Sequence, residues 1–311
     1  MTKKVLITGG NGFIGSHILR VLVKNDYSPV LYIRKTSDLW RITDLLDKIT
    51  IYNDTTPLEN LFREGGFETV INLATYYKKV HGSEDIRPMI ETNVTFPAQI
   101  LELCQRYQIG RFITAGSYFQ YSNFLENGDG YKLIPRNLYA STKSALDKIM
   151  EYYNSNGLVT ALNLVLFTPY GPMDHPEKLI PYIISNGIKK NPISLSYGLQ
   201  MINPVYVDDV AEAFLNAMRV KMVQNSDNIH INIANKRSFS IRETVSIIEE
   251  LLGYAINKQW GSFETVRFDC DNSLNTDTSD AETRLRWRPR TDIYKGILQT
   301  IEYYASDKHE G

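Results

Sequence analysis

The sequence predicts an α/β protein with a doubly wound parallel sheet, followed by a smaller mixed α/β C-terminal lobe. Short, continuously apolar segments alternate with helical patterns through the first half of the chain. This alternation is typical of buried parallel strands that are covered by helices on both faces. Beyond residue 168 the alternation becomes less regular, which indicates the second lobe.

The expected elements follow one another at short intervals. We predict strands at 5–8, 30–33, 49–52, 70–73, 112–114 and 160–167, and helices at about 12–25, 57–63, 85–107 and 138–154. The second lobe is expected to contain helices at 178–190, 208–220 and 240–252 and short strands at 205–207 and 229–233. We therefore place a first domain at 1–168 and a smaller lobe at 169–311, with some elements shared between them.

Composition narrows the class of protein. The 311 residues are 43% hydrophobic and 22% charged, with a net charge of -1 and no basic block, so a nucleic-acid partner is not expected. No apolar stretch approaches the ~18–20 residues of a membrane span, and the first apolar run is too short for a secretory signal. Cys104 and Cys270 lie far apart and form no metal-ligand pattern, so we expect no metal and a reducing, cytoplasmic location.

A glycine-rich turn, Gly9-x-x-Gly12-x-x-Gly15, directly follows the first strand and opens a helix. Glycines allow backbone amides to approach a pyrophosphate, and the helix N-terminus favours its negative charge. The alternative is a tight strand-to-helix turn that binds nothing. With strand, turn and apolar helix in this order, we predict a dinucleotide-binding Rossmann domain with contacts from Gly9, Gly12, Phe13 and Ile14.

The end of the second strand is expected to select the cofactor. An acidic residue there would bind a ribose 2′-hydroxyl, whereas arginine accommodates a 2′-phosphate. The strand ends in Arg34-Lys35, and the first carboxylate is Asp38. This pattern favours NADP, with NAD as the alternative if the two cations are only solvated surface residues. Asp54 after the third strand, and Leu73-Ala74-Thr75 after the fourth, lie where adenine and nicotinamide-ribose contacts would fall.

Tyr139 and Lys143 are four residues apart and therefore share one helix face. A nearby ammonium group favours the phenolate, so we predict that Lys143 lowers the pKa of Tyr139 and also binds the nicotinamide ribose. Alone, such a pair usually means a solvated helix face. Ser117 follows the fifth strand, at the sheet edge where ligands bind, and could hydrogen-bond the same substrate oxygen. Together with the dinucleotide turn, the three residues predict hydride transfer with Tyr139 as the proton donor or acceptor.

With these motifs, the chain resembles an extended short-chain dehydrogenase/reductase of the NAD-dependent epimerase/dehydratase family, which acts largely on nucleotide sugars. The resemblance implies that Ser117, Tyr139 and Lys143 are the catalytic triad, and that helices 85–107 and 138–154 form a homodimer interface. The resembling segments are 8–15, 70–75, Ser117 with Tyr121, 139–143, 169–172, 205–211 and 277–289.

Departures from the family pattern restrict the reaction. The family's sugar 4,6-dehydratases carry an Asp-Glu pair after the catalytic hydroxyl residue, where this chain has Tyr118-Phe119. A dehydratase is therefore not expected. Two arginines and an asparagine that are common in the family are replaced by Val165, Ile202 and Thr168. Binding of the substrate diphosphate must then use other cations; the candidates are Lys178, Arg237, Arg284 and Arg286.

The resemblance is strongest to bacterial nucleotide-sugar 4-ketoreductases, with synthases of CDP-linked dideoxyhexoses as the nearest type. We therefore predict an NADP-dependent reductase of the 4-keto group of a nucleotide-linked deoxysugar. The alternatives are a 4-epimerase with tightly held NAD and, less favoured because the triad is retained, a non-catalytic dinucleotide-sensing protein. The expected substrate contacts are Tyr76, Ser117, Tyr118, Thr168 and Lys178.

Overall fold

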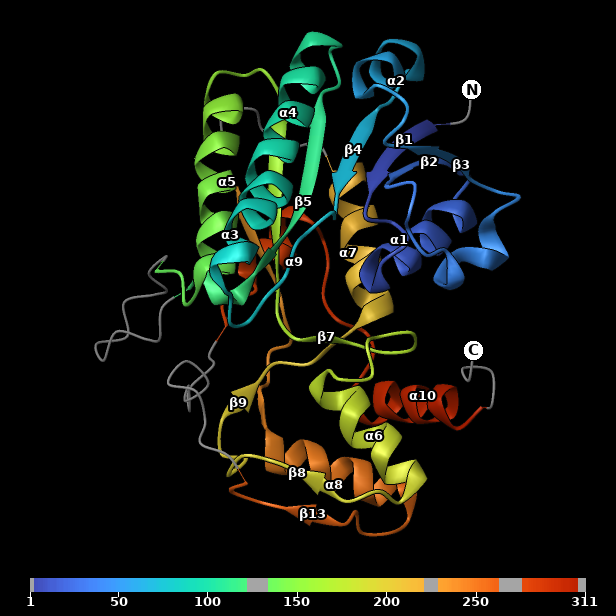
Figure 1. Cartoon of the computed structure of the whole chain (residues 1–311), viewed down its shortest axis with the longest axis vertical. Helices are drawn as coiled ribbons and strands as arrows, with labels where there is room; N and C mark the ends of the chain where they lie inside the picture. Colours follow the sequence, from blue (N-terminus) through green and yellow to red (C-terminus); the bar gives the residue numbers. More distant parts are fainter. Residues whose placement is uncertain (1–2, 122–133, 221–228, 263–275, 307–311) are drawn as a thin grey trace. The chain divides into compact units, whose positions relative to one another are not determined.

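The computed structural model describes residues 3–121, 134–220, 229–262 and 276–306. The chain divides into two compact units, coloured by sequence in Figure 1. The first unit combines Met1–Leu166 with Ala211–Asn232 and Asp280–Trp287, and the second combines Phe167–Val210, Ile233–Ser279 and Arg288–Gly311. The chain thus passes between the units several times.

The first unit is built on a sheet in which seven strands of the described chain lie in the order β11-β6-β5-β4-β1-β2-β3. Every pairing among strands β1 to β6 is parallel. The order reverses at β1, as in a doubly wound dinucleotide fold. The strands are β1 (Lys3–Thr8), β2 (Tyr27–Ile33), β3 (Thr50–Asn53), β4 (Thr69–Asn72), β5 (Arg111–Ser117), β6 (Thr160–Leu166) and β11 (His230–Ile233).

Alternating strand residues supply apolar side chains to both faces of this sheet. Leu6, Val70 and Phe112 are in register on neighbouring strands and belong to one buried cluster with side chains of α2, α4 and α5. On the other face, Ile7 and Leu31 approach Leu19 of α1 closely around Gly10. The sheet is therefore covered on both faces, which explains why its strands are continuously apolar.

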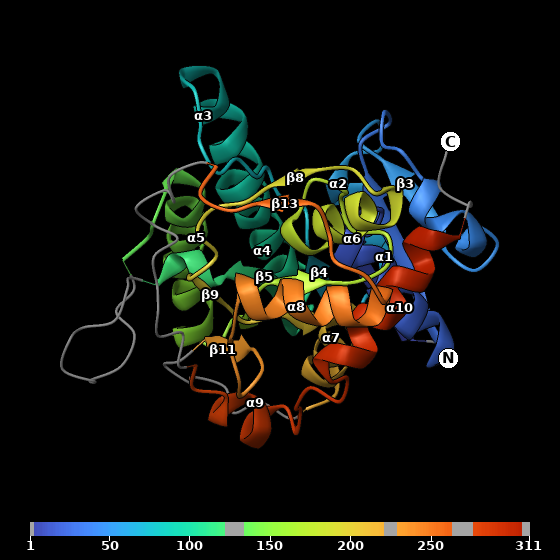
Figure 2. The same ribbon diagram turned by 90° about the horizontal axis from the view of Figure 1, so that it is seen from below.

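Helices connect the strands of the first unit: α1 (Phe13–Lys24), α2 (Leu58–Gly65), α3 (Ser83–Ile90), α4 (Phe96–Arg106), α5 (Leu138–Ser155), α7 (Val207–Arg219) and α9 (Ser279–Arg284). Figures 1 and 2 both show α4 beside α5, and the two helices are in contact. The predicted continuous helix at 85–107 is wrong in one respect, because a π-helical turn, Glu91–Thr95, separates α3 from α4. The short 3₁₀ helix η1 (Trp40–Leu45) was not predicted.

The second unit has its own buried cluster, formed mainly by isoleucines of α6 (Leu179–Lys189), α8 (Ile241–Leu252) and α10 (Ile293–Ala305). Its strands are short and occur in pairs. β7 (Pro169–Tyr170) pairs with β10 (Val205–Tyr206), β8 (Ile193–Ser194) with β13 (Lys258–Gln259), and β9 (Met201–Ile202) with β12 (Phe239–Ser240). In the part of the chain that is described, no helix has the length and apolar character needed to span a membrane.

Candidate active site

The glycine-rich turn joins β1 to α1 and is tight because it lacks side chains. Gly9 has a left-handed φ of +68°, and a Cβ there would lie 2.6 Å from the backbone nitrogen of Ala74. A Cβ at Gly15 would lie 2.4 Å from the carbonyl oxygen of Gly9. The Gly12 N–H donates to the Gly9 carbonyl at 3.1 Å. Only glycine fits at the first and last positions, and the helix N-terminus that follows matches the requirements of a pyrophosphate site.

Arg34 and Lys35 lie at the end of β2 and are exposed. Both carboxylates close to this strand end accept hydrogen bonds from backbone amides. Asp54 accepts from the Lys35 N–H at 2.8 Å, and Asp38 accepts from the Trp40 N–H at 3.0 Å. Asp54 therefore holds the loop that carries Arg34 and Lys35, a local structural role beside its predicted contact with adenine. The position that was predicted to select the cofactor presents two exposed cations.

The loop after β4 lies against the glycine turn and is fixed by a buried asparagine. Asn93, in the π-helical turn, is 1% exposed. Its amide accepts from the Tyr76 N–H at 2.8 Å and from the Thr75 hydroxyl at 3.2 Å, and donates to the Thr142 hydroxyl at 3.0 Å. Because Thr142 lies between Tyr139 and Lys143, Asn93 connects the predicted nicotinamide loop to the catalytic helix. π-Helical turns are rare and frequently occur at functional sites.

Tyr139 and Lys143 occupy the first two turns of α5, which the Asn137 side chain caps by accepting from the Ala140 N–H at 2.9 Å. Both side chains are buried, with exposures of 8% and 4%. The Lys143 ammonium nitrogen lies 5.8 Å from the centroid of the Tyr139 ring. Tyr77 contacts Tyr139 edge-on, with 4.9 Å between ring centroids. The structure therefore brings the predicted tyrosine and lysine together, away from bulk solvent.

Burial changes the expected acid–base behaviour of this pair. Desolvation raises the pKa of Tyr139 well above its ordinary value, although a hydrogen bond with Thr75 acts in the opposite direction. Desolvation also lowers the pKa of Lys143 to about 8, against the attraction of Asp147. The helix spacing places the two groups together, with the Lys143 ammonium nitrogen 5.8 Å from the centroid of the Tyr139 ring. That Lys143 lowers the pKa of Tyr139 stays a prediction, and the net shift on Tyr139 is upward because of burial.

Ser117 is the last residue of β5 and caps the short 3₁₀ helix η3 (Tyr118–Gln120). Its hydroxyl accepts from the Phe119 N–H at 3.3 Å, and its own N–H donates to Oε1 of Gln120 at 2.9 Å. Helix α5 packs on both β5 and η3. Ser117 thus lies on a turn that the catalytic helix supports.

Tyr118, one of the residues that stand in place of the dehydratase carboxylates, packs against its neighbours. The Arg136 guanidinium lies 5.6 Å from the centroid of its ring, within the range of a cation–π contact. The same arginine donates from Nε to the Tyr121 carbonyl at 3.1 Å. A cation and an aromatic ring therefore occupy the neighbourhood of Ser117.

The remaining predicted substrate residues have local roles in the structure. The Tyr76 hydroxyl donates to Asp85 at 2.6 Å, a bond that raises the pKa of Tyr76 and lowers that of Asp85. Thr168 and Lys178 belong to the second unit. Thr168 has a positive φ of 28°, rare for a β-branched residue, and Lys178 precedes α6 as its N-cap. Their contacts with substrate stay predictions.

Three polar residues of the site were not predicted: Asn93, Gln120 and Asp147. Each is buried, with exposures of 1%, 0% and 2%. Each lies within a helical pattern or directly after a strand, where a polar residue normally indicates a solvated face. The one feature of the sequence that could have indicated them is that they lie close to the predicted motifs. Over the ranges that the structure describes, no group of three or more histidine, cysteine or acidic side chains could hold a metal ion.

The chain is similar in sequence and in fold to known proteins. A CDP-abequose synthase of Yersinia pseudotuberculosis is 32% identical over 256 residues, covering 80% of this chain and 84% of the relative. A CDP-abequose synthase of Salmonella muenchen is 26% identical and covers 97% and 98%. The crystal structure of UDP-glucuronic acid 4-epimerase from Bacillus cereus, in complex with UDP-glucuronic acid and NAD, has a TM-score of 0.83 at 24% identity, covering 97% and 98%.

The model of the NAD dependent epimerase/dehydratase family matches residues 5–234. This range contains the glycine-rich turn, the loop after β4, Ser117 and the Tyr139–Lys143 pair. The chain belongs to the NAD dependent epimerase/dehydratase family, of the extended short-chain dehydrogenase/reductase type.

Proposed function

We propose that this protein reduces the 4-keto group of a nucleotide-linked deoxysugar with NADPH. The observation that carries the proposal is the buried Tyr139 on α5, beside Lys143 and the Ser117 turn. Burial raises the pKa of Tyr139, so its phenol stays protonated near neutral pH. A protonated phenol suits reduction of a ketone, because the oxygen must gain a proton while the carbon gains a hydride.

Each residue of the triad then has one task. Tyr139 donates its proton to the carbonyl oxygen of the sugar as that oxygen becomes an alcohol. The Ser117 hydroxyl donates a hydrogen bond to the same oxygen and holds it toward the phenol. The Lys143 ammonium, 5.8 Å from the phenol ring, stabilises the negative charge that forms on Tyr139 as the proton leaves. A bound reduced nicotinamide supplies the hydride.

Arg34 and Lys35 support NADPH as the cofactor. They are exposed at the end of β2, where the 2′-position of the adenosine ribose lies in dinucleotide folds. The two nearby carboxylates accept hydrogen bonds from backbone amides of the loop itself. Gly9, Gly12, Phe13 and Ile14 would hold the pyrophosphate, and Leu73, Ala74 and Thr75 would contact the nicotinamide ribose.

The relatives support a CDP-linked sugar as the substrate. Two CDP-abequose synthases from different organisms match the chain, one of them over nearly its full length. Tyr118-Phe119 in place of a carboxylate pair argues against the elimination of water. We therefore favour a CDP-linked 4-keto deoxysugar that an upstream dehydration has already produced.

The direct assay follows the absorbance of NADPH in the presence of a CDP-linked 4-keto-6-deoxysugar. The matching UDP- and dTDP-linked compounds test the choice of nucleotide. The proposal expects NADPH to be consumed only when a 4-keto sugar is present, and faster than NADH. Absence of consumption with every 4-keto sugar nucleotide would overturn it.

A 4-epimerase with tightly held NAD is the second candidate, and the NAD dependence of the matching family supports it. The two functions differ in what the purified protein carries. A reductase exchanges its cofactor at each turnover, whereas an epimerase retains NAD and returns the hydride to the other face of the sugar. Denaturing the purified protein and identifying the released nucleotide distinguishes them, since stoichiometric NAD indicates an epimerase.

We also propose a homodimer that forms through α3, α4 and α5. Ile86 and Ile90 of α3 and Tyr152 of α5 are large exposed apolar residues, with exposures of 40%, 43% and 59%. Covering them would remove apolar surface from water. Light scattering is expected to give twice the chain mass, and a shift toward the monomer when Ile90 and Tyr152 are changed to polar residues.

A further inference from the structure

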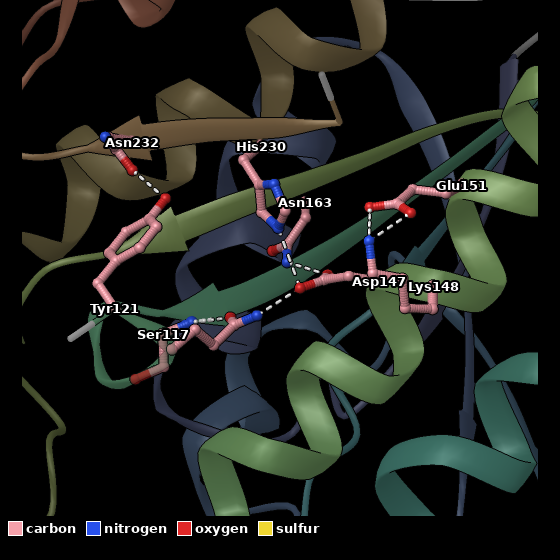
Figure 3. Close-up of polar contacts among 9 residues, drawn as sticks. Ser117, Tyr121, Asp147, Lys148, Glu151, Asn163, His230 and Asn232 are labelled. Atoms are coloured by element: carbon pink, nitrogen blue, oxygen red, sulfur yellow. Dashed lines mark hydrogen bonds and ion pairs between the residues drawn. The ribbon is translucent and has the colours of Figure 1, made fainter. Parts of the chain in front are cut away.

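A buried carboxylate lies directly behind the catalytic residues. Asp147 is one helical turn after Lys143 on α5 and is 2% exposed. Its oxygens meet three side chains from three other elements, as Figure 3 shows for the surrounding network. Gln120 Nε2 donates at 2.5 Å, Asn163 Nδ2 donates at 2.6 Å, and His230 Nε2 lies at 3.0 Å.

These contacts fix the orientation of the surrounding groups. An ionised carboxylate only accepts hydrogen bonds, so beside an ionised Asp147 the Nε2 of His230 would be the donor. Asn163 points its amide nitrogen at Asp147 and leaves its buried Oδ1 with no hydrogen-bond partner among the described residues. The orientation of the Asn163 amide is therefore determined by its hydrogen bond to the Asp147 carboxylate, and not by a hydrogen bond to its own carbonyl oxygen. Such an anion is stable in a buried place only when donors and a nearby cation compensate its charge.

Gln120 transmits this interaction to the catalytic serine. Its Nε2 donates to Asp147, and its Oε1 accepts the Ser117 N–H at 2.9 Å. Both ends of one buried amide are thereby used. Gly116 makes room for this contact, because a Cβ there would lie 2.7 Å from Gln120 Oε1 and 2.3 Å from Asn163 Oδ1.

Among the described residues, the basic groups that interact with Asp147 are Lys143, Lys148 and His230. Lys143 is buried on the same helix, and the Asp147 charge acts on it in the direction that favours the ammonium form. Lys148 is exposed and pairs with Glu151 at 2.7 Å. Figure 3 shows this pair apart from the buried network. Lys143 is therefore the cation that most needs the Asp147 charge.

We propose that Asp147 is a positioning residue that serves both the catalytic lysine and the catalytic serine. Its charge holds the Lys143 ammonium in its ionised form, and its hydrogen bond to Gln120 fixes the backbone of Ser117. In the reduction assigned above, on which this inference rests, the first effect maintains the cation beside Tyr139. The second effect keeps the Ser117 hydroxyl in place for the substrate oxygen.

The charge effect is tested with Asp147→Asn, which keeps the shape of the side chain. Glu151→Gln is the matched control, because it removes a carboxylate from the same helix without touching the network. Titration of Lys143 is followed by heteronuclear NMR of lysines labelled at Cε, with the signal assigned from Lys143→Arg. We expect Lys143 to lose its proton at lower pH in Asp147→Asn than in wild type or Glu151→Gln.

This measurement needs no substrate, so it decides the inference even if the proposed reaction is wrong. A folded Asp147→Asn protein in which Lys143 titrates as in wild type would overturn the charge effect.

The positional effect is tested with Gln120→Met, which removes both hydrogen bonds of the Gln120 amide, to Ser117 and to Asp147, and keeps the Asp147 carboxylate. We expect kcat for the 4-keto sugar nucleotide to fall about tenfold, as for the loss of one charge-assisted hydrogen bond, with little change in the affinity for NADPH. The pH dependence of kcat should be the same in Gln120→Met as in wild type, whereas it should change in Asp147→Asn. Wild-type kcat in Gln120→Met would overturn this part, and the variant also serves if Asp147→Asn does not fold.

Discussion

In the proposed reaction, the glycine-rich turn and helix α5 would contribute in opposite ways. The turn functions through the absence of side chains: a Cβ at Gly9 or Gly15 would lie within 2.6 Å of another backbone atom. Helix α5 functions through polar side chains, since Tyr139, Lys143 and Asp147 are all buried in it. In the proposed site, a cofactor would meet bare backbone at the turn and desolvated ionisable groups on α5.

The turn and the helix should therefore respond differently to amino-acid substitutions. The turn depends on local backbone geometry, which a short motif describes completely. The helix depends on neighbours that are distant in sequence, including Asn93, Gln120 and His230. Changes to the turn should therefore affect folding and cofactor binding together, whereas changes to α5 should affect the chemistry while the fold is retained.

The largest effect on rate is expected from Tyr139→Phe. Loss of the proton donor should lower kcat by about 10² to 10⁴-fold, while NADPH still binds. Tyr294→Phe is the matched control, because Tyr294 lies on α10 of the second unit and is 44% exposed. Steady-state assays with binding measured by NADPH fluorescence separate the two effects. Equal rates in both variants would show that α5 does not carry the acid.

Gly9→Ala should be the most damaging change in the turn. Both a left-handed φ and the contact with Ala74 oppose the new Cβ, so we expect a loss of about 1–3 kcal/mol in the free energy of unfolding, together with weaker dinucleotide binding. Gly66→Ala separates the two causes, because Gly66 has a φ of +62° and open space around it. Its loss should be smaller, with cofactor affinity unchanged. Thermal unfolding with and without NADPH measures both, and equal losses would remove the argument for close approach.

Arg34→Ala tests the choice of cofactor. One charge-assisted contact with a 2′-phosphate is removed, so NADPH affinity should fall about tenfold while NADH affinity stays the same. Arg63→Ala changes an exposed arginine of α2 and should alter neither. Calorimetric titration of each protein with both nucleotides provides the comparison. A parallel loss for NADPH and NADH would assign Arg34 a general role in place of selectivity.

A smaller and graded effect is expected from pH. The pKa of Lys143 is lowered to about 8 by burial, so the cation is present below that pH and is lost as the pH rises through it. The kcat/KM of the enzyme should therefore decline on the alkaline side from about pH 8. The raised pKa of Tyr139 adds no loss in that range, because the phenol remains protonated. A profile that is flat to pH 10 would contradict the role given to Lys143.

The sequence was sufficient to predict strands β1 to β6 of the sheet in the first unit, but the strand at 229–233 was expected in the second lobe, whereas β11 lies in this sheet. Continuous apolar strands and the turn from Gly9 to Gly15 are local signals, and the structure follows them closely. The π-helical turn at Asn93 could not be predicted, because it results from hydrogen bonds to residues far along the chain.

The pKa values of the site residues were harder to predict from the sequence than their positions. The spacing of Tyr139 and Lys143 gave their shared helix face, but not the burial that raises one pKa and lowers the other. Asp147 has an i,i+4 relation to Lys143 that resembles an ordinary surface pair. Only the fold shows that its partners include Gln120 of η3 and Asn163 of β6.

The most direct test of the central claim follows the hydrogen that is transferred. The enzyme is incubated with a CDP-linked 4-keto-6-deoxysugar and NADPH carrying deuterium at the reactive nicotinamide carbon, and the product is examined by NMR and mass spectrometry. The account predicts one deuterium on the sugar carbon that held the carbonyl, with oxidised cofactor formed in equal amount. A product without deuterium, or a change of configuration with no consumption of NADPH, would contradict it.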